Sequence, residues 1–217
     1  MKLSLKLVVL LLVLTFAGVA SASVTTHTYI APPDWSLMCL KGIPLDPDPI
    51  SVFGSEGVID GRLYKWNAVG QGTDVYNAFD PEAFGNMLLT DGYWLNNTSG
   101  SDETVSFSGL NDNDTMDVWI SLPEKGWTLI GHPFNYSFLW ENAKVTDGNT
   151  TKTLRDASQW GVNWISSVGY GWDEIGQGTF DIGIEGDYSM EDSLRPWHGY
   201  WIESKVDKTA LILESIP

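Results

Sequence analysis

Hydrophobic and polar residues alternate with a period of two in several short segments of the chain. In residues 63–67, one side of an extended strand carries Tyr64 and Trp66, and the other side carries Lys65 and Asn67. Residues 128–131 and 199–202 are equally short, rich in aromatic and β-branched side chains, and bounded by turn-forming residues. The pattern predicts an all-β fold in which Tyr64 and Trp66 point into a small core.

Helical patterns are scarce in this sequence. Only residues 50–56 and 153–164 predict helices, and both would be short. The chain contains 22 glycines and 10 prolines, which predicts many turn-like connections between the strands.

Two blocks of the chain recur at nearly the same spacing. Residues 64–73, with a Tyr-x-Trp triplet and a Gly-Gln-Gly-Thr sequence, return as residues 170–179 after an offset of 106. The Gly-Tyr-Trp block at 92–95 returns at 199–202 after an offset of 107. Because both blocks recur in the same order, the chain is predicted to contain two copies of one module.

A third recurring block locates an insertion in the second copy. Residues 35–38 match residues 127–130 at an offset of only 92, so the second copy holds about 14 additional residues further on. We place this insertion near 142–159. The prediction is two tandem, similar, small β-sandwich or barrel-like modules with little helix, at 23–112 and 113–217.

The recurring blocks resemble a known module. The order Gly-Trp-Thr-Leu-Ile-Gly-His-Pro at 126–133, an aromatic block at 170–173 and Gly-Tyr-Trp-Ile at 199–202 is similar to the "GWNLIG-P … W … GYW" β module. In the first copy, Asp34 stands at the position of the opening glycine. The resemblance implies a secreted or cell-surface protein of archaea or bacteria, but it implies no particular activity, because a fold does not fix a function.

The N-terminal segment has the layout of a cleavable export signal. Lys2 and Lys6 precede an apolar stretch at 7–14, and the small-residue sequence Ala-Ser-Ala ends at Ala22. A retained membrane anchor is the alternative, although the apolar stretch is short for a span of roughly 20 residues. We therefore predict a signal peptide at 1–22, a secreted, extracellular or cell-surface location, and no stable membrane span after cleavage.

The charge balance narrows the classes of partner. The chain has 12 Lys and Arg residues against 28 Asp and Glu residues, a formal net charge of −16. Such a surface repels phosphate backbones, so nucleic-acid binding is not expected. Cys39 is the single cysteine, so no intramolecular disulfide is possible and the thiol is expected in a buried strand.

No motif in the sequence points to a catalytic site. His27, His132 and His198 are the three histidines, and none stands at metal-ligand spacing from another. His132 and His198 both lie in motif segments, so a shared metal or acid-base role is the alternative to ordinary roles at strand ends, which we expect. A carboxylate pair for glycoside hydrolysis is not marked out by its position. We predict that the protein is not an enzyme and has no catalytic residues.

Oxygen-donor residues gather between the two copies, at 111–117. Asp112, Asp114 and Asp117 are the calcium candidates there, but the segment lacks the central glycine and closing glutamate of a hand-type loop. A solvated linker is the favoured interpretation. Calcium is the only cofactor for which the sequence offers candidate ligands, and a structural metal site is otherwise not expected.

Five Asn-x-Ser/Thr sequons occur in polar connections, where glycosylation would place sugars if the host modifies them. The candidate acceptors are Asn96, Asn97, Asn113, Asn135 and Asn149.

Two functions are consistent with these features. The first is a non-catalytic structural or adhesive protein that contacts cell-surface proteins or glycans. The alternative is a carbohydrate-binding module, since exposed aromatic rings can stack on sugars. The recurring tryptophans are expected in the core, which leaves four unmatched ones as binding candidates, and the oligomeric state stays open. The recurring set is Trp66, Trp94, Trp172 and Trp201, and the unmatched set is Trp140, Trp160, Trp164 and Trp197.

Overall fold

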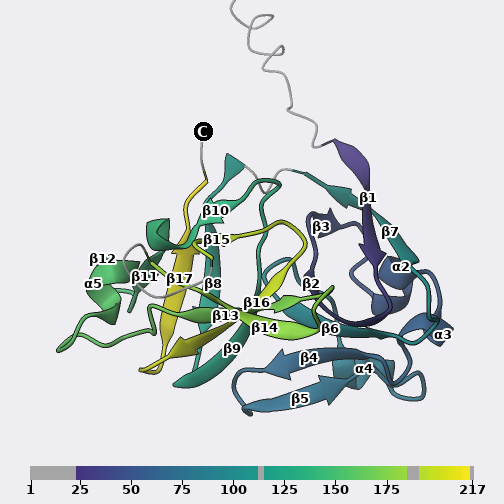
Figure 1. Cartoon of the computed structure of the whole chain (residues 1–217), viewed down its shortest axis with the longest axis horizontal. Coiled ribbons are helices and arrows are strands. Elements are labelled where there is room, and N and C mark those ends of the chain that lie inside the picture. The colour runs from purple at the N-terminus through teal and green to yellow at the C-terminus, as the bar shows by residue number, and fades with distance from the viewer. Residues whose placement is uncertain (1–22, 112–114, 185–190, 216–217) are drawn as a thin grey trace, which may run out of the picture.

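The computed structural model describes residues 23–111, 115–184 and 191–215 (Figure 1). The protein is all-β, as predicted, and its strands form antiparallel sheets joined by turns and short helices. The predicted signal peptide lies outside the described residues. No helix within the described ranges is long and apolar enough to cross a membrane.

One four-stranded antiparallel sheet occurs twice, once in each half of the chain. In the first half its strand order is β2-β6-β4-β5, and in the second half the equivalent order is β9-β16-β13-β14 when read from the same edge. The register repeats too, because Tyr64 pairs with Trp94 and Tyr170 pairs with Trp201. The strands are β2 (Asp34–Cys39), β4 (Leu63–Asn67), β5 (Gly72–Val75), β6 (Gly92–Asn97), β9 (Gly126–Gly131), β13 (Gly169–Asp173), β14 (Gly178–Ile182) and β16 (Gly199–Ser204).

A second sheet accompanies the first in each half. The sheet of the first half has the order β1-β7-β3, and that of the second half has the order β12-β11-β17-β8. A small additional sheet pairs β10 with β15. The strands are β1 (Val24–Ala31), β3 (Ile43–Pro44), β7 (Glu103–Leu110), β8 (Val118–Leu122), β10 (Phe138–Leu139), β11 (Lys144–Thr146), β12 (Thr151–Thr153), β15 (Ser193–Leu194) and β17 (Thr209–Leu213).

Each half has its own hydrophobic core, to which both of its sheets contribute. In the first half, Tyr29 and Phe107 from β1 and β7 share a cluster with Tyr93 from β6. In the second half, Leu211 from β17 shares a cluster with Tyr200 from β16. Strand β7 shows the expected alternation, with every second side chain buried. The two halves therefore have the same layered organisation (Figure 1).

The predicted insertion forms regular structure at the edge of the second half. Strands β11 and β12 add to β17, and α5 (Leu154–Ser158) follows them. The Thr153 hydroxyl caps α5 by accepting a hydrogen bond from the backbone N–H of Asp156 at 3.1 Å. The helix is shorter than predicted, because it ends at Ser158 and the chain then turns through Gly161 with φ +92°.

The other predicted helix is divided into two. The Asp48 side chain accepts a hydrogen bond from Ile50 N at 2.8 Å and so begins α2 (Pro49–Phe53). Gly54 ends the helix in the left-handed region, with φ 81°. A second short helix, α3 (Glu56–Ile59), follows, and a third, α4 (Pro81–Phe84), lies between β5 and β6.

The face of strand β4 that packs against the core is the opposite of the predicted one. Leu63 is fully buried, and Lys65 on the same side donates a hydrogen bond to the carbonyl oxygen of Phe84. Tyr64 and Trp66 are only half-buried. The prediction that these two aromatic residues fill the core is wrong, because alternation tells which side chains share a face but not which face is inward.

The two repeated sheets meet along their backbones. Cys39 N donates a hydrogen bond to Trp197 O at 3.0 Å, and the equivalent Gly131 N donates to Thr90 O at 2.7 Å. Strand β4 also contacts β9, and β2 contacts β13. The contacts come in equivalent pairs, so the two halves are related by an approximate two-fold relationship.

A glycine makes this close approach possible. A Cβ atom on Gly131 would lie 2.6 Å from both the Cβ atom of Cys39 and the carbonyl oxygen of Asp91. Gly92, the first residue of the Gly-Tyr-Trp block, faces the same restriction, at 2.8 Å from Ile130 O. Gly92 has a glycine counterpart in Gly199, whereas the counterpart of Gly131 is Cys39. At both Gly92 and Gly131 the backbone of the other half passes directly against the glycine, which leaves no room for a side chain.

Candidate functional site

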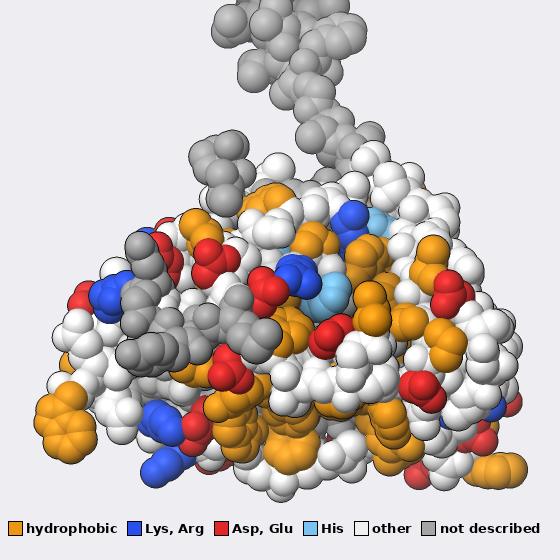
Figure 2. Space-filling model, in the orientation of Figure 1, with side chains coloured by type: hydrophobic (Ala, Val, Ile, Leu, Met, Phe, Trp, Pro, Cys, Tyr) orange, Lys and Arg blue, Asp and Glu red, His pale blue; other side chains and the backbone are white. Residues whose placement is uncertain are grey.

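Eight large aromatic side chains remain half-buried where the two repeated sheets meet. They line two pockets, each formed by residues of both halves. Figure 2 shows hydrophobic side chains gathered in the lower part of the view, over the region where β13, β14 and β4 lie in Figure 1. The eight residues are Trp35, Tyr64, Trp66, Trp94, Trp127, Tyr170, Trp172 and Trp201.

The first pocket has a volume of about 330 Å³ and rings set at steep angles to one another. Trp94 is edge-on to Trp35, with an interplanar angle of 86° and ring centroids 6.0 Å apart. It is also edge-on to Trp172, at 77° and 5.0 Å. Tyr64 is tilted by 48° against Trp35, and Thr73 completes the lining.

The second pocket, of about 400 Å³, repeats this arrangement. Trp201 is edge-on to Trp127 at 85° and to Trp66 at 78°. Tyr170 is tilted by 56° against Trp127, and Thr179 takes the place of Thr73. The two edge-on angles agree to within 1° between the pockets and the tilted pair to within 8°, so the pockets are equivalent.

Each pocket receives one of its walls from the opposite half. Trp172 belongs to the second copy but lines the first pocket, and Trp66 belongs to the first copy but lines the second. The Trp172 indole Nε1 donates a hydrogen bond to Trp35 O at 2.9 Å, and Trp66 Nε1 donates to Trp127 O at 2.6 Å. The two copies therefore complete each other's pocket.

The glutamine of each Gly-Gln-Gly-Thr sequence forms hydrogen bonds with the backbone of the opposite copy. Gln71 Oε1 accepts a hydrogen bond from Trp127 N at 2.9 Å, and its Nε2 donates to Trp127 O at 3.0 Å. Gln177 makes the same pair of contacts with Trp35, at 3.2 Å and 3.1 Å. Both glutamines have positive φ, 48° and 47°, which places their side chains across the boundary. The repeated sequence thus encodes a clamp between the copies as well as a turn.

The prediction that the recurring tryptophans lie in the core is wrong. Trp66, Trp94, Trp172 and Trp201 are all half-buried and line the two pockets. Recurrence was interpreted as a sign of burial, whereas these residues recur because each copy contributes to two equivalent surface sites.

The four unmatched tryptophans do not form one exposed platform. Trp140 is completely buried in the second core, and its Nε1 donates to Ser167 O at 2.9 Å, so its ring is not available to a glycan. Trp197 is half-buried, with Tyr29 at 5.6 Å between ring centroids. Trp164 is half-buried beneath the Lys152 ammonium. Of the four, Trp160 is the ring that is fully exposed.

The remaining candidate sites are dispersed. Asp112, Asp114 and Asn113 lie outside the described residues, and Asp117 Oδ1 accepts a hydrogen bond from Ser215 N at 3.0 Å. In the described part of the chain, no group of three or more His, Cys, Asp or Glu residues is placed to hold a metal ion. His132 and His198 do approach, through a hydrogen bond from His132 N to His198 O at 3.3 Å.

One sequon is corrected by the structure. Asn97 is buried, and its Nδ2 atom donates hydrogen bonds to Ala31 O and Ser101 O at 3.0 and 2.7 Å, so it is not accessible for glycosylation in the folded protein. Asn96 and Asn135 are half-buried, and Asn149 is exposed in the turn between β11 and β12.

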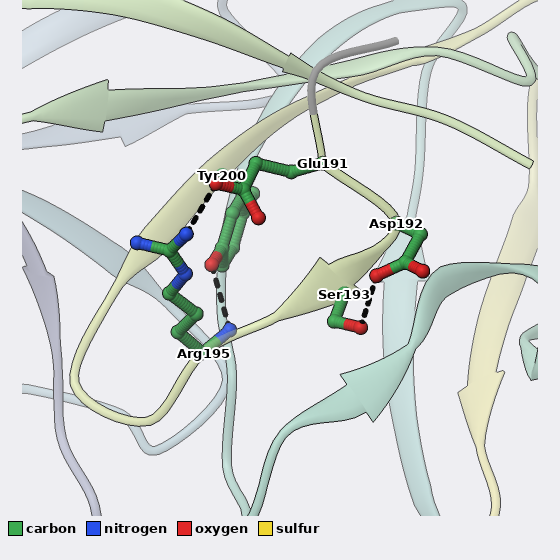
Figure 3. A network of polar contacts seen from close by, with 5 residues as sticks. All are labelled: Glu191, Asp192, Ser193, Arg195 and Tyr200. Carbon is green, nitrogen blue, oxygen red and sulfur yellow. Dashed lines mark hydrogen bonds and ion pairs between the residues drawn. The ribbon is translucent and has the colours of Figure 1, made fainter.

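A polar pocket of about 310 Å³ adjoins the first aromatic pocket through the shared Trp172. Arg195 lines it and forms an ion pair with Glu191, while the Arg195 backbone N–H donates to Tyr200 Oη at 2.7 Å (Figure 3). Glu174 in the same pocket accepts a hydrogen bond from Tyr29 Oη at 2.5 Å. These charged groups already bond to other residues of the chain, so a structural role explains them.

Two ionisable groups at the boundary between the halves have displaced pKa values. Burial raises the pKa of the Cys39 thiol to about 12, and its Sγ donates to His132 O at 3.2 Å. Burial also raises the pKa of Asp91 to about 6, against the opposing attraction of Lys65. The thiol is therefore neutral at physiological pH and is not a nucleophile.

No protein-family model, curated protein or solved structure matches this chain. The resemblance to the tandem surface module therefore depends on the sequence motifs alone.

Proposed function

We propose that the protein is a non-catalytic extracellular or cell-surface protein of the adhesive type, which holds its ligand in the two aromatic pockets. The observation that carries this proposal is the duplication of the pocket. Two equivalent sites are built with matching ring angles, and each is completed by a tryptophan from the other copy.

The exposure of so many rings supports binding over packing alone. Burying a large apolar side chain stabilises a protein by about 1.5–3 kcal/mol, and exposed apolar patches in soluble proteins are commonly interaction sites. Here the aromatic residues of both copies remain half-exposed, side by side, in the folded chain. Their partial exposure gives up stability that a ligand in the pockets would restore.

Two equivalent pockets suit a ligand that repeats along a surface. When both pockets bind groups of the same polymer, the second contact is intramolecular and the overall affinity exceeds that of either site. This property fits adhesion to a cell envelope better than capture of a single small molecule.

The test is attachment of the secreted protein to isolated cell envelopes, measured by co-sedimentation. We expect Trp94→Ala and Trp201→Ala each to weaken attachment at least tenfold and the double variant to abolish it. Trp119→Ala is the matched control, because Trp119 is 59% exposed on β8 and lines neither pocket. Near-ultraviolet circular dichroism checks that each variant is folded. Undiminished attachment of the folded double variant would contradict the proposal.

A carbohydrate-binding module is the second candidate. The observation that favours it is Trp160, whose ring is fully exposed in the loop after α5 and is free to stack on a sugar face. Titration with envelope polysaccharides, followed by tryptophan fluorescence, distinguishes this candidate. It predicts a spectral change that Trp160→Ala removes and that Trp94→Ala leaves intact.

A further inference from the structure

We propose that each aromatic pocket is a site for a methylated ammonium cation, such as the trimethylammonium group of choline. This inference deepens the proposed function, on which it rests, by naming the chemical group that the pockets accept.

The neighbouring rings of each pocket do not form a flat platform. A flat platform that stacks on a sugar presents one ring face, whereas in these pockets neighbouring indoles stand at 77–86° to one another. Rings at steep angles to one another line a corner in which a compact, roughly spherical group can contact more than one of them. Clusters of aromatic rings recognise quaternary ammonium groups through cation–π attraction.

The lining of both pockets is almost entirely apolar, and several polar groups beside it are already hydrogen-bonded within the chain. The Nε1 atoms of Trp66 and Trp172 donate to backbone carbonyl oxygens of the opposite copy. The side-chain amides of Gln71 and Gln177 likewise form hydrogen bonds with backbone groups. A sugar needs hydrogen-bond partners for its hydroxyl groups, and a trimethylammonium group needs none.

The charge of the protein favours a cation. The formal net charge is −16, so a cationic ligand is attracted from a distance. The cation–π contacts within the described part of the chain use Phe84, Trp164 and Phe180, none of which lines either aromatic pocket. The volumes, about 330 and 400 Å³, are in the range of small-molecule sites.

The test compares choline with its neutral isostere 3,3-dimethyl-1-butanol, which replaces the charged nitrogen by carbon. The full secreted chain is titrated with each compound by tryptophan fluorescence and calorimetry. We expect choline to bind two sites per chain and at least about fivefold more tightly than the isostere, which corresponds to the ~1 kcal/mol of an exposed cation–π contact. Equal binding of the isostere, or no binding of choline, overturns the proposal.

Variants assign the sites. Trp94→Ala should remove one choline site, Trp201→Ala the other, and Trp119→Ala neither. Retention of two sites in the folded Trp94→Ala and Trp201→Ala double variant also overturns the proposal, because choline would then be bound elsewhere.

Competition at the cell envelope separates this inference from the proposed function. If the pocket variants lose attachment but choline neither binds nor competes, the ligand class is wrong and the adhesive function stands. If choline binds in the pockets but the variants attach normally, the adhesive function is wrong and the cation site stands. Competition by a soluble saccharide in place of choline supports the carbohydrate alternative and contradicts the cation.

Discussion

The indole of Trp66 and the carbonyl oxygen of Trp127 are joined by a hydrogen bond of 2.6 Å that crosses from one copy of the module to the other. Its counterpart runs in the opposite direction, from Trp172 to Trp35, at 2.9 Å. The same two bonds hold the copies together and position a wall of each pocket. Stability of the pair and integrity of the sites are consequently linked.

Removing either crossing bond should destabilise the whole chain. We expect Trp66→Phe and Trp172→Phe each to lower the free energy of unfolding by about 1–2 kcal/mol, through the lost hydrogen bond and the smaller ring. Urea denaturation followed by circular dichroism measures the change. Trp119→Phe serves as the control and should stay within about 0.5 kcal/mol. Clearly unequal losses at Trp66 and Trp172 would contradict their equivalence.

The glycine at the close approach of the two halves should not tolerate a side chain. We expect Gly131→Ala to lower the free energy of unfolding by about 3 kcal/mol or to prevent folding, because its Cβ would meet Cys39 and Asp91 at 2.6 Å. Gly57→Ala, in α3, has open space around the added atom and should be neutral or stabilising by up to about 1 kcal/mol. Thermal unfolding of both variants provides the comparison.

The Cys39 thiol should not react in the native protein. Its side chain is completely buried and its pKa is raised to about 12, so neither access nor the thiolate form is available at pH 8. Titration with a thiol-reactive chromogenic disulfide should give no reaction in buffer and one thiol per chain in guanidinium chloride. Rapid labelling of the folded protein would show that the boundary between the halves opens readily.

Stability should fall as the pH rises from about 4 to about 6 through the ionisation of Asp91. The folded protein raises this pKa to about 6 from its usual value near 4, so the native state holds the proton over a range in which the unfolded chain has lost it. The native state is therefore penalised once the carboxyl group ionises. The penalty should reach about 1–2 kcal/mol at pH 7, since Asp91 is half-buried and its charge is partly screened.

Asp91→Asn should remove this part of the pH dependence. Compared with the unmodified protein, the variant is expected to gain relative stability between pH 4 and pH 7 in urea denaturation. A constant difference between the two proteins over that range would show that Asp91 does not titrate in this way. Asp74→Asn, on β5, is the matched control.

The fold class and the repeat could be predicted from the sequence, whereas the pockets could not be predicted directly. Recurring blocks at nearly constant offsets revealed the second copy, and period-two alternation revealed which residues share a face. Alternation on β4 did not reveal that Leu63 faces the core and Trp66 faces the other copy, since that choice depends on how the sheets meet. The assignment of aromatic residues to core or surface therefore needed the three-dimensional arrangement.

In the second copy, the glycines that alternate with the aromatic residues indicate which face of the strand is buried, and the sequence alone shows this alternation. On β13, Gly169 and Gly171 alternate with Tyr170 and Trp172, and both glycines are buried. A Cβ atom on Gly171 would meet the ring of Phe180 at 2.3 Å. The glycines mark the inward face, which places the large rings outward. In β4, Leu63 and Lys65 occupy the corresponding places, so the same signal is absent from the first copy.

Because Trp66 and Trp172 each line the pocket of the opposite copy, one copy alone does not form a complete pocket. A chain shortened to one copy would retain three of the four rings of a single pocket and would lack the tryptophan wall that the other copy supplies. The smallest competent unit is accordingly the pair.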